Sequence, residues 1–384
     1  MNPVYIYDAI RTPRARAKPT GGLHDLKPQQ LLRALYNHLH ARGGLDPALI
    51  GDIVLGCVTQ HGDQAGNIAK TSALYAGWPT SVGGITVNRF CSSSIDAINM
   101  AALRIGAGQE QAMIAGGVEM MSRVPMLSDN ATVFVDPAFA ARCSMLMMGS
   151  GADLIATLNG INREQADELA LQSQRRAAHA RQQGYFKSII PIDNPSTGKC
   201  CEQDECIRPE ITLPELQALA PAFAELGAQG VDQFQLAAHP VLERIEHIHT
   251  AGNSPAMADA AAVVLLGNEQ LSAELGVAPR ARIVAAASAS DDPMQVLTGC
   301  TAAAAKLMHQ QEITAEDIDL FEVHEAFAAT IINCAQTLDI PTDKLNVNGG
   351  VIALGHPMGA TGAIMTGMLL DELERRDQRL GLVS

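Results

Sequence analysis

The chain has 384 residues, 47% hydrophobic and 18% charged, which is enough apolar material for a large core and two or three domains. The net charge of −14 argues against general binding to nucleic acid or to anionic membranes. An anionic ligand would therefore have to be met locally, by a few arginines or by helix N-termini.

The start of the chain and its cysteines indicate the compartment. Residues 1–13, MNPVYIYDAIRTP, predict a folded strand, because no basic segment precedes an apolar stretch as in a secretory signal. No apolar run reaches the ~18 residues of a membrane span. Eight irregularly spaced cysteines in a long chain predict reduced thiols and not a disulfide scaffold. We therefore expect a cytoplasmic protein with no membrane span.

Short apolar runs alternate with helix-like segments near the N-terminus, which is typical of a layered α/β fold. The spacing of leucines predicts a helix over 29–43. Buried strands are expected at 50–60 and 111–121. Between them, residues 83–108 predict a strand, a tight turn and a helix.

The composition changes over residues 123–249, which are richer in Gln, Arg, Glu and Pro. An amphipathic stretch at 162–184 predicts a long helix, and loop-forming residues dominate 191–215. We interpret 123–249 as an inserted segment of helices and loops. The α/β pattern returns at 256–268 and 281–290.

A weak internal duplication relates the two ends of the chain. An Asp-Ile pair opens an apolar strand at 52–53 and again at 317–318, and a Val-Asn pair closes a later strand at 87–88 and 347–348. Ligand sites in α/β sheets favour strand ends. We therefore expect loops from two similar halves to meet in a shared cleft that includes Cys91.

Cys91 lies in the segment NRFCSSSID, where a strand is expected to end and a helix to begin. A thiol at a helix N-terminus is favoured as thiolate by the helix dipole. The small serines that follow would leave its flank open to a substrate. Taken alone, the segment fits a catalytic nucleophile or a buried structural cysteine equally well.

Two histidines are candidates for acid–base chemistry. His356 lies in GGVIALGHPMGATGA, a glycine-rich approach loop that matches neither a Walker loop nor a dinucleotide fingerprint. It could deprotonate a nearby thiol, or it could be a packed or surface histidine. His324, in EVHEAFAA, directly follows an expected strand and could stabilise an oxyanion, although a structural role is the simpler interpretation of that segment alone.

No metal site is predicted. HEAFAA is not HExxH, and the CCEQDEC (200–206) and HIH (247–249) segments lack the spacing of a zinc module. Solvated loop cysteines are the preferred interpretation of 200–206.

The segments NRFCSSSIDA, GGVEMMSRVPM, HTAGNSPAMADAAAVVL, HEAFAA and NVNGGVIALGHPMGATGA together resemble the thiolase family, in order over essentially the whole chain. GGxIALGHPxGATGA is highly specific to that family. The resemblance implies an α/β thiolase fold, with two duplicated βαβαβαββ halves in an αβαβα arrangement. It places one half at 1–122 plus 250–276, a loop domain on the coenzyme A (CoA) side at 123–249, and an incomplete second half at 277–384.

The resemblance implies an acyl-CoA C-acyltransferase, a 3-ketoacyl-CoA thiolase that works by ping-pong chemistry. Cys91 would be the nucleophile that carries the acyl group, His356 the general base, and His324 an oxyanion-hole donor beside His356. The main-chain N–H of Cys91 would contribute to a second oxyanion hole. The resemblance implies that no metal is needed, because the thioester already acidifies the α-carbon and the oxyanion holes supply the rest. No cofactor is implied, since CoA is itself a substrate and product.

Substrate contacts carry over from the family for a few positions only. Arg208 matches a residue near the adenine and phosphate end of CoA, while Met148 and Phe327 match residues that line the pantetheine and acyl pocket. Ser254 lies in TAGNSPA, in which Pro255 replaces the usual pantetheine-contacting serine, so the resemblance implies an unusual acyl pocket.

The resemblance also bears on partners and on the C-terminus. His324 is similar to thiolases that degrade fatty acids with a hydratase/dehydrogenase partner, and family members form homodimers or homotetramers. Thiolases end in a CxGGG-type loop whose cysteine is the base for the α-proton, whereas this sequence ends at RLGLVS384. We therefore expect the native protein to be longer.

Two alternatives remain open at this stage. A decarboxylating ketoacyl synthase would share the fold, but GHPMGATGA argues against it. A non-catalytic acyl-CoA-binding or scaffold subunit of a β-oxidation complex would fit the absence of the second cysteine.

Overall fold

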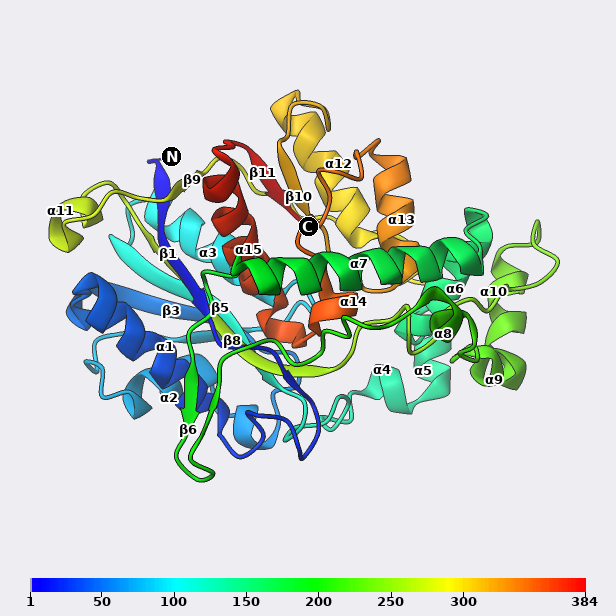
Figure 1. Cartoon of the computed structure of the whole chain (residues 1–384), viewed down its shortest axis with the longest axis horizontal. Helices are drawn as coiled ribbons and strands as arrows, with labels where there is room; N and C mark the ends of the chain where they lie inside the picture. The colour runs from blue at the N-terminus through cyan, green and yellow to red at the C-terminus, as the bar shows by residue number, and fades with distance from the viewer. Residues whose placement is uncertain (1) are drawn as a thin grey trace.

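Two sheets and three helical layers alternate through the protein in a computed structural model that describes residues 2–384 (Figure 1). The strands are β1 (Val4–Arg11), β2 (Ala15–Arg16), β3 (Ile50–Gly56), β4 (Ile85–Val87), β5 (Ala112–Met120), β6 (Ile192–Asn194), β7 (Lys199–Cys201), β8 (Ala258–Gly267), β9 (Ala281–Ile283), β10 (Leu320–Glu322) and β11 (Gly381–Val383). The helices are α1 (Pro28–Gly43), α2 (Ile68–Tyr75), α3 (Ser93–Gly106), α4 (Thr132–Val135), α5 (Pro137–Arg142), α6 (Met148–Leu158), α7 (Arg163–Gln183), α8 (Leu213–Gln217), α9 (Ala224–Leu226), α10 (Asp232–Ala238), α11 (Leu271–Leu275), α12 (Gly299–Gln311), α13 (Ala328–Thr337), α14 (Val351–Leu354) and α15 (Thr361–Arg376).

The larger sheet has the order β4-β3-β5-β8-β1-β9, with β2 paired to β8. Strands β3, β4 and β5 are parallel, and β8 is antiparallel to both β5 and β1. Every residue of β5 and of β8 is buried, because helices cover both faces of the sheet. The chain order β1-α1-β3-α2-β4-α3-β5-β8 confirms the predicted βαβαβαββ half.

The helices form one layer on each outer side and one between the sheets. Helices α1 and α2 contribute to an apolar cluster on one face of the larger sheet, and α3 and α15 to a cluster on its other face. Helix α15 also contacts the smaller sheet, β10-β11, whose remaining apolar side chains pack with α12 and α13. The αβαβα arrangement expected from the sequence is therefore confirmed.

The second half follows the order β9-α12-β10-α13-α15-β11, with α14 before α15. The prediction of a strand that closes at Val347-Asn348 is wrong. In its place, a single β-bridge joins Leu345 to Phe321. Asn346 explains the difference, because it has a left-handed φ of 43° and its side chain bonds the backbone of Val323. The chain therefore leaves the sheet instead of extending along it.

A cavity of about 810 Å³ lies between strands β9 and β11 of the second half. Strand β11 pairs with β10 and strand β9 pairs with β1, and the cavity is lined by residues 281–291 on one side and 379–384 on the other. In the first half, β8 lies at the corresponding position, between β5 and β1. The α/β pattern expected at 281–290 begins with β9, which ends at Ile283, and the residues that follow line the cavity.

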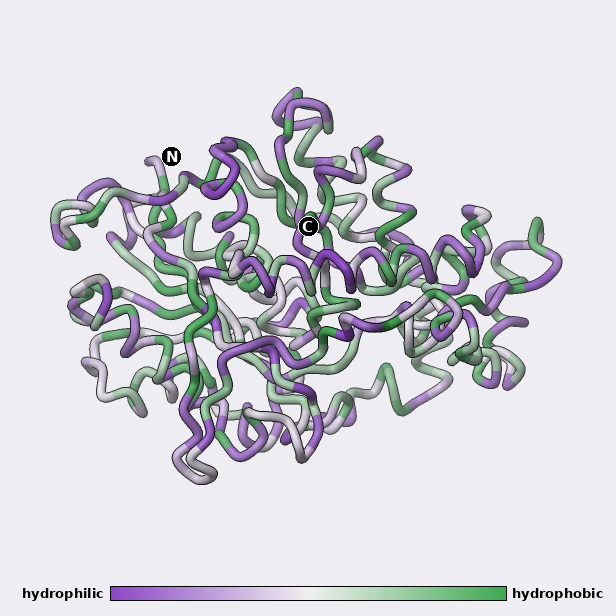
Figure 2. Tube along the Cα trace, viewed as in Figure 1, coloured by the Kyte–Doolittle hydropathy of each residue, from purple (hydrophilic) through white to green (hydrophobic). Residues whose placement is uncertain are grey.

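The segment between β5 and β8 contains seven of the helices and the short β6-β7 hairpin. Helix α7 begins with a capping box between Asn162 and Gln165 and ends at Gly184, which has a left-handed φ of 66°. It crosses the front of the molecule in Figure 1, and its tube is largely hydrophilic in Figure 2. The predicted helix at 162–184 is therefore confirmed, whereas the domain boundaries stay a prediction. Within residues 2–384, no helix has the length and apolar composition needed to cross a bilayer.

A buried ion pair fixes this segment to the larger sheet. Arg11 of β1 donates two hydrogen bonds to the carboxylate of Asp204, at 2.7 and 2.9 Å, and both side chains are almost fully buried. The same carboxylate accepts the backbone N–H of Arg14 at 2.8 Å. Although burial opposes ionisation, the Arg11 guanidinium holds the pKa of Asp204 below its usual range.

We expect Asp204→Ala to lower the free energy of unfolding by about 3–5 kcal/mol, because it leaves a buried guanidinium without its partner. Urea denaturation of the variant and of Asp193→Ala, which removes an exposed aspartate nearby, measures the effect. Equal midpoints for the two variants would contradict the structural role of this pair.

Candidate active site

A tight turn between β4 and α3 positions Cys91. Asn88 accepts the backbone N–H of Phe90 at 2.8 Å, and the Ser93 hydroxyl donates to the Phe90 carbonyl at 2.6 Å. Phe90 has a left-handed φ of 48°, which is uncommon for a bulky residue and is stabilised here by these bonds. The turn directs Cys91 away from the larger sheet and into the cavity.

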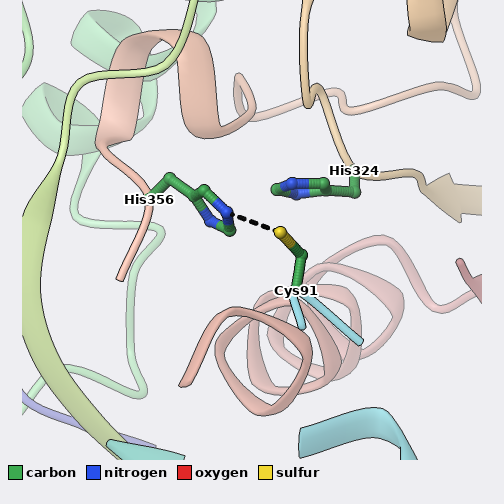
Figure 3. A group of neighbouring side chains, drawn as sticks. All are labelled: Cys91, His324 and His356. Carbon is green, nitrogen blue, oxygen red and sulfur yellow. Dashed lines mark hydrogen bonds between the residues drawn. The ribbon is translucent and has the colours of Figure 1, made fainter. Parts of the chain in front are cut away.

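His356 approaches Cys91 from the second half of the chain. Its Nε2 lies 3.0 Å from the Cys91 Sγ, and its Nδ1 lies 2.8 Å from the Thr361 hydroxyl (Figure 3). Its backbone N–H donates to the carbonyl of Ala256 at 2.8 Å. If Thr361 accepts the Nδ1 proton, the Nε2 lone pair is free to accept the thiol proton.

His324 completes a group of three side chains that point toward one another (Figure 3). It lies two residues after the end of β10, and its ring lies 4.4 Å from the ring of His356, centroid to centroid. Both ring nitrogens of His324 are buried and have no hydrogen-bond partner. A buried imidazole without partners is costly, so its polar atoms are available to a ligand.

Burial keeps this group neutral. Burial, with a smaller contribution from the negative charge of Glu119, raises the pKa of the Cys91 thiol to about 12. Burial also lowers the pKa of His324 to about 4 and that of His356 well below its usual value. The resting pair is therefore a thiol beside a neutral imidazole. Burial therefore opposes the thiolate that the α3 dipole would favour.

Glu119 anchors one side of the loop that carries His356. This carboxylate is fully buried at the end of β5 and accepts four hydrogen bonds. The donors are the backbone N–H groups of Val58, Thr59 and Gly359, at 2.9, 3.1 and 3.0 Å, and the Gln64 amide at 2.7 Å. Glu119 therefore links the loop after β3 to the turn that follows His356.

Glu325 anchors the other side of the same loop. Its buried carboxylate accepts the backbone N–H of Ile352 at 3.1 Å, the Ser173 hydroxyl at 2.9 Å and the Asn346 amide at 3.1 Å. His356 lies between the two anchored positions, Ile352 and Gly359. The loop is therefore held by one carboxylate from each half of the protein.

Comparisons with known proteins identify the family of this chain. The family described as "Thiolase, N-terminal domain" matches residues 4–231, and "Thiolase, C-terminal domain" matches residues 277–384. The chain belongs to the thiolase family.

Curated relatives and solved structures cover this thiolase from end to end. It is 39% identical to proteins named 3-ketoacyl-CoA thiolase from Cronobacter sakazakii and Salmonella typhimurium, over 100% of this chain and 96% of each relative. The crystal structure of the Bacillus anthracis acetyl-CoA acetyltransferase matches with a TM-score of 0.86 and 34% identity. That of human mitochondrial 3-ketoacyl-CoA thiolase matches with a TM-score of 0.86 and 28% identity. Both structural matches cover 100% of this chain and 95% of the other.

Of the four predicted substrate-binding residues, only Met148 belongs to the cavity lining. Among the described residues, the lining includes Cys91, His324 and Met148 but does not include Phe327, Arg208 or Ser254. Phe327 packs instead against Phe223 and His249, with ring centroids 5.8 and 5.3 Å apart. The Arg208 guanidinium donates to the Gly252 carbonyl at 3.4 Å, and the Ser254 hydroxyl is buried without a partner.

Glu119 and Glu325, which anchor the loop of His356, were not among the residues predicted from the sequence. A charged residue inside the apolar strand AMIAGGVEM was the available signal for Glu119, because an unpaired buried carboxylate would be prohibitively costly. Glu325 is adjacent to His324 in EVHEAFAA, but nothing in that segment marks it as an anchor of a distant loop. Cys300, at the start of α12, lines the cavity, and no motif marks it in the sequence.

We expect Glu119→Gln to lower the free energy of unfolding by about 1–3 kcal/mol. The variant replaces an acceptor oxygen with an amide N–H₂ group that would face backbone N–H donors. Urea denaturation of this variant and of Glu202→Gln, which changes an exposed carboxylate, makes the comparison. A loss no larger than that of Glu202→Gln would show that the four hydrogen bonds do not stabilise the loop.

We also expect iodoacetamide to alkylate Cys91 slowly at neutral pH, roughly 1000-fold more slowly than a free thiol, because its raised pKa leaves little thiolate. The rate should continue to rise with pH above 9. Mass spectrometry of the Cys91 peptide, with the exposed Cys143 as internal reference, gives the rate. A plateau below pH 8 would indicate a thiolate–imidazolium pair instead.

Proposed function

We propose that this thiolase cleaves 3-oxoacyl-CoA with CoA, giving acetyl-CoA and an acyl-CoA shortened by two carbons, or catalyses the reverse condensation. The observation that carries the proposal is the 3.0 Å contact between Cys91 Sγ and His356 Nε2 at the edge of a large cavity. The names of the curated relatives support the same substrate class.

In the first step, the Cys91 sulfur attacks the keto carbon of the substrate while His356 Nε2 takes the thiol proton. The bond between the α-carbon and the keto carbon then breaks, so that the acyl group stays on Cys91 as a thioester and acetyl-CoA leaves as its enolate. The enolate takes up one proton to become acetyl-CoA, which balances the proton lost by Cys91, and His356 returns to its neutral form. A neutral thiol with a neutral base in contact is suited to this concerted transfer. The lowered pKa of His356 keeps it ready to accept a proton at neutral pH.

His324 is proposed as the donor to the developing enolate oxygen. Its lowered pKa, about 4, keeps the ring neutral, with one N–H and no protein acceptor for it. A preorganised donor in a buried site stabilises an oxyanion without reorganisation, and losing one such donor costs ~100- to 1000-fold in rate. We propose the main-chain N–H of Cys91 as a donor to the second oxyanion, at the keto carbon.

In the second step, free CoA enters and His356 takes the proton of its thiol. The CoA sulfur attacks the acyl carbon, and the sulfur of Cys91 leaves and regains a proton. Each step therefore uses the same base, which is why one histidine in contact with Cys91 supports both half-reactions.

The remaining assignments concern binding and assembly. Met148 at the start of α6 would contact the acyl chain or pantetheine, with Phe327 packed beside it in the same apolar cluster. Arg208 and Ser254 would contact CoA from 123–249 and from the turn before β8, because an acidic chain must meet the phosphates locally.

We further propose a cytoplasmic homodimer or homotetramer that requires no cofactor and degrades fatty acids with a hydratase/dehydrogenase partner.

We expect a mass increase of one acyl group on Cys91 when the protein is incubated with a 3-oxoacyl-CoA such as acetoacetyl-CoA. His356→Ala should slow acylation by ~100- to 10,000-fold, and His324→Ala by ~100- to 1000-fold. Cys143→Ser, which changes an exposed cysteine, is the matched control. Mass spectrometry of quenched samples gives the rates, and the magnesium–enolate absorbance of acetoacetyl-CoA reports turnover with CoA.

Two outcomes would overturn the proposal. An acyl adduct that persists in Cys91→Ser would place the nucleophile elsewhere. Tight binding of CoA without an adduct or turnover would instead favour an acyl-CoA-binding or scaffold subunit, and activity with malonyl thioesters but not with CoA would favour a decarboxylating synthase.

A further inference from the structure

The three side chains at the candidate active site also have the chemistry of a metal site. The Sγ of Cys91 and ring nitrogens of His324 and His356 all lie within 4.8 Å of one another. One thiolate and two imidazoles form a donor set that suits Zn²⁺ and not Mg²⁺ or Ca²⁺. In the part of the chain that the structure describes, this is the one such cluster of three ligands.

The geometry needs little adjustment to hold a tetrahedral ion. With Zn–S near 2.3 Å and Zn–N near 2.0–2.1 Å, tetrahedral ligand atoms lie about 3.3–3.6 Å apart. The Cys91–His356 separation is 3.0 Å, and no pair in the cluster exceeds 4.8 Å. Changes of up to about 1.5 Å in these separations, shared between two side chains, would therefore bring three ligands to one ion.

The surroundings of the histidines favour a ligand. Neither nitrogen of His324 has a protein partner, so binding a metal would break no hydrogen bond there. Thr361 lies against Nδ1 of His356, and such a partner commonly orients a metal-binding histidine and fixes its tautomer. The negative charge of Glu119 near Cys91 favours a cation, whereas buried Arg14 near the histidines opposes one.

The cavity reaches two of the three ligands. It is lined by both Cys91 and His324, so an ion and a water molecule can reach them from solvent.

We propose that Cys91, His324 and His356 form an inhibitory Zn²⁺ site. The ion binds the Cys91 sulfur as thiolate, the thiol proton is released to solvent, and the His356 lone pair moves from that proton to the metal. Neither zinc nor sulfur changes oxidation state. The bound ion occupies both the nucleophile and the base, so it blocks acylation. Metal binding stands independently of the proposed thiolase reaction, and only the loss of activity rests on it.

Cobalt(II) reports this site without any substrate. Titrating the purified, reduced protein with Co²⁺ should give visible bands of tetrahedral cobalt and a near-ultraviolet thiolate-to-cobalt band, both displaced by Zn²⁺. Cys91→Ser should lose the thiolate band, and His324→Ala should bind cobalt at least ~10-fold more weakly. Cys200→Ser, which removes an exposed thiol beside Cys201, should leave both bands unchanged.

Three outcomes would overturn the proposal. The thiolate band could survive in Cys91→Ser and disappear in Cys200→Ser, which would place cobalt on the loop cysteines. Cobalt could bind with six-coordinate bands only, which would exclude the thiolate. His324→Ala, checked by circular dichroism for an intact fold, could bind as tightly as the parent protein, which would remove His324 from the site.

A second measurement separates this proposal from the proposed reaction. In the acetoacetyl-CoA assay, Zn²⁺ should abolish turnover, a chelator should restore it, and Mg²⁺ at the same concentration should not inhibit. If the protein shows no turnover but gives the cobalt bands, the thiolase proposal fails and the metal site stands. If it turns over and Zn²⁺ neither inhibits it nor displaces cobalt, the metal site fails alone.

Discussion

Two buried carboxylates hold the loop from which His356 reaches Cys91, and the geometry of the site depends on them. Glu119 belongs to β5 of the first half and Glu325 follows β10 of the second, and their backbone contacts lie on either side of His356. A glycine-rich loop has little conformational preference of its own. Fixing it by hydrogen bonds to buried charged groups is therefore what keeps a base from one half 3.0 Å from a nucleophile of the other.

The same burial that makes the loop rigid also sets the chemistry of the site. Out of water, the thiol keeps its proton and both imidazoles stay neutral, so the resting site carries no ion pair. His324 is left with unpaired nitrogens, which costs stability in the free protein and leaves them available to a ligand. An oxyanion would accept a hydrogen bond from the N–H of the His324 ring, whereas a metal ion would bind the lone pair of its other nitrogen. The same unpaired ring therefore supports both proposals.

Regular, strongly patterned segments were predictable. The helices at 29–43 and 162–184 and the return of the α/β pattern at 256–268 were predictable because apolar periodicity, caps and buried runs are local properties of a sequence. The residues at which strands and helices end were not predictable from these local patterns. The strand expected at 50–60 stops at Gly56, because the amides of Val58 and Thr59 turn to Glu119 from another strand.

By itself, the sequence determined the helix and strand pattern, the duplication, and the residues with reactive side chains, Cys91, His324 and His356. Tertiary structure alone decided that these three meet, that two distant carboxylates hold them, and that Cys91 rests as a thiol. It also decided that Phe327, Arg208 and Ser254 lie outside the cavity lining. The physical reason is that contacts and pKa values depend on distance and burial in space, whereas motifs and periodicity depend only on order along the chain.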